Sequence, residues 1–200
     1  MHALAVDYQP ADPTWTRPEW DIESLNFIES YLPASETIAK QKYHTLLKHI
    51  YTLPKDKNTY GLIHQDAHQN NFLMDCNGRL TLFDFDECAY SWFINDIAIV
   101  LFYISIDAEE LGFSTAAAFT QEFMSHFLRG YRQAYTVDSK WFKEIPTFLK
   151  LRELELYAVV HRDFNIKNID DPWIAGFMHD RKLHIEKDLP FIEFNFESLA

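Results

Sequence analysis

Cysteine, glycine and positive charge are all scarce in this sequence. Its 200 residues include two cysteines, Cys76 and Cys88, which form no CxxC pair, so neither a disulfide framework nor a cysteine zinc site is expected. Low cysteine use also fits a reduced compartment, and we predict a cytoplasmic protein. The glycines are isolated from one another and form no glycine-rich loop; they are Gly61, Gly78, Gly112, Gly130 and Gly176.

Basic residues are outnumbered by acidic ones, 18 to 30, which gives a formal net charge of −12. Such a surface repels nucleic acid and anionic lipid, and no local basic stripe offsets the repulsion. We therefore predict no nucleic-acid partner and no membrane partner. A negative field favours cationic or metal-bound substrates, although keeping the protein soluble is the simpler explanation of the charge.

Long apolar runs are also missing. The longest, around residues 97–104, is too short to span a bilayer. The first ten residues, MHALAVDYQP, have no basic start and no long apolar stretch, so they do not resemble a signal peptide. Apolar residues still make up 48% of the chain and aromatic residues 16%, which is enough for a hydrophobic core and excludes disorder for most of the chain. The length favours one domain.

Hydrophobic periodicity predicts a mainly α chain with a small β hairpin region, an α+β class. Apolar spacing and candidate caps indicate helices at about residues 21–31, 35–51, 95–106, 114–135, 146–160 and 173–186. Short β-prone runs with an Asn-Gly turn signal among them lie at 60–63, 72–74 and 80–85, with the turn at 75–78. One aromatic stripe is expected to be core: Phe119, Phe123, Phe127 and Tyr131.

Polar residues concentrate in the β region, between residues 61 and 86. Asp66, an asparagine five residues later (Asn71) and an aspartate after the hairpin (Asp84) have the layout of a kinase catalytic centre. In that layout the first aspartate accepts the proton of the substrate hydroxyl, whereas the other two residues hold Mg²⁺ on the nucleotide phosphates. Mg²⁺ prefers oxygen ligands and the base must stay free of the metal, so the residue types suit these roles.

Three motifs in this order resemble those of the aminoglycoside phosphotransferase and choline kinase-like family. They are similar to the family's H-G-D-x-H-x-x-N, I-D-[FW]-[DE] and D-[LI]-A patterns, and they read HQDAHQNNF at 64–72, FDFD at 83–86 and NDIA at 95–98. The order of the three makes the match specific, although each motif alone is short. The family's motifs place the catalytic aspartate at Asp66 and the metal ligands at Asn71 and Asp84.

The same resemblance implies supporting roles for the neighbours of these three residues. It implies His64 as a residue that shapes the loop and Asp96 as a structural brace or helix cap. His68 lies inside the first motif, and Asp86 is implied as a further contact to the metal or the substrate. One departure is Gln65, because the family usually has glycine at this position, and the difference bears on the conformation of the loop.

The resemblance implies an ATP-dependent kinase that transfers the γ-phosphate to a hydroxyl of a small, possibly cationic molecule, with Mg²⁺ and ATP or another nucleoside triphosphate as cofactors. It implies the C-terminal lobe of a protein-kinase-like fold over residues 1–200, with the catalytic loop and metal motif in 60–98 and a helical substrate region at about 110–190. No β-rich N-terminal lobe with its phosphate-covering loop is visible, so we expect an excised or truncated form that binds ATP weakly alone. The sequence assigns neither substrate-binding residues nor an oligomeric state.

Other interpretations of the same residues remain open. His64 and His68, with Asp66 between them, suit a hydrolase-type metal site if Asp84 and Asp86 complete it, although this leaves the spacing of the asparagine unexplained. A further alternative is that this region is only a solvated polar loop beside the hairpin. A different class of function is a non-catalytic binding module derived from a degenerate kinase.

Two further patterns are expected to be structural. The run His161-Arg162-Asp163 resembles the H-R-D tripeptide of kinases, but no hairpin with a metal-binding aspartate follows it, so we interpret it as the end of a helix. Glu153, Glu155 and Asp163 are suited to meet a cationic substrate, but we interpret them first as a solvated helix face.

Overall fold

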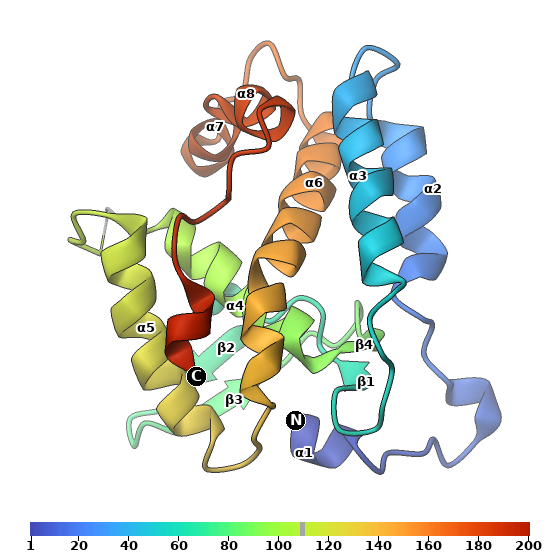
Figure 1. Cartoon of the computed structure of the whole chain (residues 1–200), viewed down its shortest axis with the longest axis vertical. Helices are drawn as coiled ribbons and strands as arrows, with labels where there is room; N and C mark the ends of the chain where they lie inside the picture. The colour runs from blue at the N-terminus through green and yellow to red at the C-terminus, as the bar shows by residue number, and fades with distance from the viewer. Residues whose placement is uncertain (109–110) are drawn as a thin grey trace. The chain divides into compact units, whose positions relative to one another are not determined.

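The computed structural model describes residues 1–108 and 111–200 and, within 22–25, the backbone alone. Figure 1 shows mainly helices with short strands, which confirms the predicted class. The strands are β1 (Tyr60–Ile63), β2 (Phe72–Met74), β3 (Leu80–Leu82) and β4 (Ala89–Trp92). The helices are α1 (His2–Ala5), α2 (Asp21–Tyr31), α3 (Thr37–Ile50), α4 (Phe93–Ile106), α5 (Ala116–Tyr131), α6 (Ile145–Asp163), α7 (Pro172–Met178) and α8 (Arg181–Glu186).

The chain divides into two compact units. Unit 1 comprises residues 1–20, 55–148 and 192–200, and unit 2 comprises residues 21–54 and 149–191. All of the residues that the sequence singles out for catalysis and metal binding belong to unit 1. The predicted substrate region, about 110–190, takes in segments of both units, and its first residue lies outside the described residues. A single lobe over 1–200 stays a prediction.

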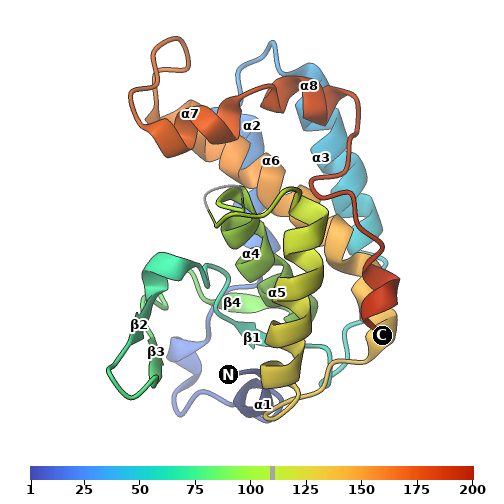
Figure 2. The ribbon, with the colours of Figure 1, turned by 90° about the vertical axis from the view of Figure 1, so that its left-hand side faces the viewer.

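Two antiparallel pairs of strands form the β region of unit 1. Strand β1 pairs with β4, so that Tyr60 lies opposite Trp92, and β2 pairs with β3 as a hairpin. The hairpin is visible in Figure 2, where its strands are labelled β2 and β3. The Asn-Gly signal forms its turn, because Asp75 accepts hydrogen bonds from the backbone N–H groups of Asn77 and Arg79, and Gly78 takes a φ of 76°.

Several predicted boundaries are wrong, each for a local reason. The strand predicted over 80–85 ends at Leu82, because Asp84 adopts a left-handed φ of 65° that no strand accommodates. The helix predicted over 173–186 is divided into α7 and α8 at Asp180, whose φ is 53°. Strand β4 was not predicted. Its four residues come soon after the exposed FDFD run, and no turn signal such as Asn-Gly separates the two segments.

Helix α4 forms the centre of unit 1 and is apolar on nearly every side. Its fully buried side chains include Phe93, Ile97 and Phe102. The aromatic stripe on α5 is only partly core, because Phe119 is buried while the next three rings are half-buried. These rings instead stack along the helix at centroid separations of 5.5, 5.7 and 5.9 Å. No helix of the described residues is long and apolar enough to cross a bilayer.

Unit 2 is built around charged side chains as well as apolar ones. Glu153 is fully buried and receives hydrogen bonds from Lys150 and Arg181, each at 2.7 Å. The expected solvated face is therefore wrong for Glu153, which is buried and paired, while Glu155 is half-buried beside Arg152. The run from 161 to 163 does end α6, as the sequence predicts.

Candidate active site around Asp66

The segment after β1 turns sharply into the motif that contains Asp66. His64 is fully buried, and the backbone N–H groups of His64 and Gln65 both donate to the carboxylate of Asp96, at 3.0 and 2.8 Å. Asp96 lies in the first turn of α4 and is itself buried. One carboxylate thus fixes two consecutive peptide groups immediately before Asp66 in the chain.

The carboxylate of Asp66 is held by two side chains of the same loop. The Asn71 amide donates to the Asp66 backbone carbonyl at 2.9 Å and lies 3.3 Å from its Oδ2. The ring nitrogen Nε2 of His68 also lies 3.3 Å from Oδ2. The Asp66 side chain keeps 22% of its surface exposed, so it is oriented by its neighbours and still open to a reactant.

The nitrogen and the oxygen of the Asn71 amide have different surroundings. The residue is 5% exposed, and its nitrogen is committed to Asp66. Within the part of the chain that the structure describes, its oxygen Oδ1 accepts no hydrogen bond from the protein. A neutral oxygen of this kind is a donor that Mg²⁺ accepts.

Asp84 is brought toward the loop by its preceding residue. The Phe83 N–H donates to the Asn71 carbonyl at 3.1 Å, and the Phe83 carbonyl accepts from His64 Nε2 at 3.0 Å. The left-handed backbone of Asp84 then turns the chain out of β3, and its side chain is exposed. The segments of Asn71 and Asp84 are thus joined by a backbone hydrogen bond, and an amide and a carboxylate offer oxygen donors of the kind that a hard divalent cation prefers.

His64 is engaged at both ring nitrogens. Its Nδ1 accepts from the Asp66 N–H at 3.3 Å and its Nε2 donates to the Phe83 carbonyl, which together define a neutral ring with the proton on Nε2. This supports a role in shaping the loop. Among the described residues no three His, Cys, Asp or Glu side chains are grouped to hold a metal, so the hydrolase-type alternative gains no support.

Asp86 is anchored through its backbone. Its carbonyl accepts from the guanidinium of Arg17, which also donates to the Cys88 carbonyl at 2.9 Å, while the Asp86 side chain is exposed.

The hairpin of β2 and β3 presents apolar side chains to solvent, with Leu73, Met74 and Leu80 each more than 60% exposed. The β region therefore offers both charged and apolar surface next to Asp84.

A buried network around Asp96 was not found from the sequence. His2, which is 5% exposed, contacts Asp96 Oδ2 through Nε2 at 3.0 Å, and its Nδ1 lies 2.6 Å from the hydroxyl of Tyr131. The His2 ring also stacks on Phe93 at 4.5 Å. Burial alone would raise the pKa of Asp96, but the contacts with His2 and the two N–H groups outweigh it, so that pKa is lowered.

Gln65 occupies a backbone conformation that favours glycine. Its φ is 67°, and its side-chain oxygen is buried without a partner among the described residues. We predict that Gln65→Gly raises the free energy of unfolding by about 0.5–1 kcal/mol, because relief of the left-handed strain exceeds the added chain entropy. Urea unfolding measures this; a variant less stable than the parent would show that the Gln65 side chain contributes contacts that matter more than strain.

Comparison with known proteins places these motifs among phosphotransferases. The sequence model of the family described as "Phosphotransferase enzyme family" matches residues 1–144. The amicoumacin kinase of Bacillus subtilis (strain 168) is 36% identical over 203 residues, which cover all of this chain and 59% of that kinase. The solved amicoumacin kinase hAmiN, in complex with AMP-PNP, Ca²⁺ and Ami, is also 36% identical, with a TM-score of 0.90.

More distant structures share the fold alone. A microcompartment-associated aminopropanol kinase is 20% identical with a TM-score of 0.59, and it is matched over 94% of this chain and 59% of its own. A choline/ethanolamine kinase family protein from Mesorhizobium loti is 13% identical with a TM-score of 0.60, over 99% of this chain and 60% of its own. The chain therefore spans about 59% of the length of the two amicoumacin kinases that are 36% identical to it.

Proposed function

This chain belongs to the phosphotransferase enzyme family, and we propose that it carries the catalytic loop of an ATP-dependent kinase acting on a hydroxyl group of a small molecule. The observation that carries the proposal is the joint placement of Asp66 and Asn71. The nitrogen of the Asn71 amide donates to the Asp66 backbone carbonyl at 2.9 Å and lies 3.3 Å from the Asp66 carboxylate, and its oxygen would then bind the metal. This is the division of labour that phosphoryl transfer needs between base and metal ligand.

In this proposal Asp66 orients the acceptor hydroxyl and takes its proton as the oxygen attacks the γ-phosphorus and the bond to the β–γ bridging oxygen breaks. Asn71 and Asp84 would hold Mg²⁺, which would supply neutralisation of the phosphate charge. His68 positions the Asp66 carboxylate, and His64 and Asp96 fix the preceding backbone. Catalysis then rests on positioning and electrostatics rather than on a covalent intermediate.

The acceptor we propose is a small amine-bearing alcohol. The net charge of −12 favours cationic molecules. Close to Asp66, the carboxylate of Asp107 accepts from Gln69 at 3.1 Å, and the ring of Tyr103 lies 4.9 Å from that of His68. An acidic and an aromatic side chain beside the loop suit an ammonium group. Amicoumacin, named for relatives that are 36% identical, is the first acceptor to test.

The test uses a chimera in which this chain replaces the matched region of the Bacillus subtilis amicoumacin kinase, so that the unmatched part of that kinase is supplied. We expect phosphorylation of amicoumacin or of another small amino alcohol with Mg-ATP, detected by mass spectrometry and ³¹P NMR. A folded chimera that binds AMP-PNP but phosphorylates no member of an alcohol panel would contradict the proposal and favour a non-catalytic binding module.

The chain by itself is expected to bind Mg-ATP weakly or not at all. The chain spans 59% of the length of the amicoumacin kinase that it matches, and the proposed metal ligand Asp84 is exposed to solvent. Isothermal calorimetry of Mg-ATP against these 200 residues checks this, with the chimera as the positive control. Binding in the micromolar range by the chain alone, about −8 kcal/mol, would refute it.

A further inference from the structure

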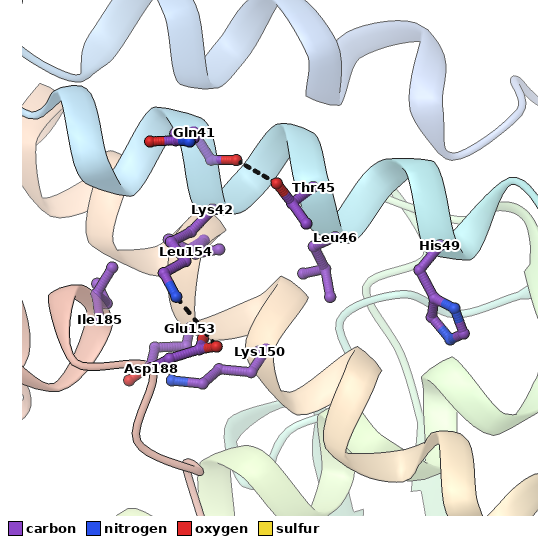
Figure 3. A pocket seen from close by; sticks show the side chains of 10 residues that line it. All are labelled: Gln41, Lys42, Thr45, Leu46, His49, Lys150, Glu153, Leu154, Ile185 and Asp188. Carbon is purple, nitrogen blue, oxygen red and sulfur yellow. Dashed lines mark hydrogen bonds and ion pairs between the residues drawn. The ribbon is translucent and has the colours of Figure 1, made fainter.

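Unit 2 contains a pocket of its own. It has a volume of about 390 Å³ and lies between α3, α6 and the end of α8, as Figure 3 shows. That volume is within the range of sites that hold small molecules. All of its lining residues belong to unit 2, whereas Asp66, Asn71 and Asp84 belong to unit 1, so none of the proposed catalytic or metal-binding residues lines it.

Two lysines, Lys42 and Lys150, and two carboxylates, Glu153 and Asp188, line this pocket. Each oxygen of the buried Glu153 carboxylate receives one cation, Lys150 on one side and Arg181 on the other, both at 2.7 Å. Lys42, from α3, lies 3.0 Å from Asp188. When Arg181 is counted, which pairs with Glu153 but is not part of the lining, the network has three cations and two carboxylates in a chain whose overall charge is −12, and this local excess favours an anionic ligand.

The pair between Lys42 and Asp188 is the replaceable part of this arrangement. The Asp188 side chain is 66% exposed and that of Lys42 is 34% exposed, and ion pairs at such exposure contribute little to stability. Asp188 also follows α8 with a left-handed φ of 58°. In Figure 3 the Lys42 side chain reaches down from α3 toward the carboxylates, so a ligand carboxylate has the same cation available.

Apolar side chains form part of the remaining wall, which also includes Gln41, Thr45 and His49. Leu154 and Ile185 are each 3% exposed and line the pocket together with Leu46. We propose that this pocket binds a small organic carboxylate, whose charged group takes the place of Asp188 on Lys42 and whose apolar body packs against these three side chains. The proposal concerns binding to unit 2, and its test needs no phosphotransferase activity.

The ligand test is a titration with 4-methylpentanoate, followed by the NMR signals of the Leu46, Leu154 and Ile185 methyl groups. Its neutral amide, acetate and inorganic phosphate are titrated in parallel at matched ionic strength. We expect saturation in the low millimolar range or tighter for 4-methylpentanoate and for no other probe. Equal binding of the amide, tighter binding of phosphate, or no saturation by 4-methylpentanoate would each overturn the proposal.

Two substitutions should change the affinity in opposite directions. Lys42→Met keeps the aliphatic stem but removes the ammonium, and should weaken binding by roughly tenfold or more, as expected for a lost charge-assisted hydrogen bond. Asp188→Asn removes the competing carboxylate while keeping a residue that tolerates positive φ, and should tighten binding. Lys48→Met, at an exposed position of the same helix, is the matched control.

Melting temperatures close to the parent show that each variant is folded. If Asp188→Asn weakens binding as Lys42→Met does, the ion pair is part of the pocket's structure and the replacement model is wrong. If neither variant changes the affinity, Lys42 does not receive the carboxylate and the proposal fails.

Discussion

Replacing Asp66 by Asn should lower the rate of phosphoryl transfer by about 10²–10⁴-fold and leave AMP-PNP affinity nearly unchanged. The substitution keeps the size of the side chain and an oxygen for the Asn71 contact, but it removes the negative charge that would accept the hydroxyl proton. The measurement is kcat with a saturating acceptor, together with AMP-PNP binding, in the chimera described above.

The matched control is Asp12→Asn, which changes a half-buried aspartate of unit 1 outside the proposed site. Asp12 caps the short helix Pro13–Trp15 by accepting from the Thr14 N–H, and asparagine caps equally well, so no loss of rate is expected. Full activity in Asp66→Asn would show that another group takes the proton. Loss of nucleotide binding with an unchanged rate per bound complex would instead assign Asp66 to the nucleotide.

The sequence allowed the central loop to be predicted because the information there is local. Asp66 and Asn71 are five residues apart, and a loop of that length can return one side chain to the other, which the structure shows as a contact of 3.3 Å between Asn71 Nδ2 and Asp66 Oδ2. The hairpin that follows could be predicted from its Asn-Gly pair, because asparagine and glycine are the residues that most readily adopt the positive φ of tight turns. Helix α2 was also predicted with its observed bounds.

The sequence patterns did not predict contacts between residues that lie far apart in the chain. His2 meets Asp96 across 94 positions of the chain and Tyr131 across 129, and no periodicity reports such contacts. Glu153 was misjudged for a related reason: its two cationic partners reverse the usual preference of a carboxylate for water, and one of them, Arg181, is 28 residues away. Only the packed structure brings these charges together.

The largest loss of stability is expected at Asp96. Asp96→Ala leaves the N–H groups of His64 and Gln65 and the ring of His2 without their acceptor in a buried setting, and should lower the free energy of unfolding by about 3–5 kcal/mol. Urea unfolding at neutral pH measures it. Asp96→Asn, which keeps one acceptor oxygen, should lose less, and a loss below about 1 kcal/mol in the alanine variant would mean that water replaces the carboxylate.

The same carboxylate predicts how stability depends on acid. The pKa of Asp96 is lower in the folded chain than its ordinary value of 3.8, so folding favours the charged form. Its contribution is therefore complete above the unfolded value and is lost as the pH falls through the folded pKa. The difference in unfolding free energy between the parent and Asp96→Asn should stay constant near neutral pH and shrink below about pH 3.8, the ordinary value of the group. A difference that is flat through this range would assign the acid sensitivity to other carboxylates and leave Asp96 held by its hydrogen bonds in either protonation state.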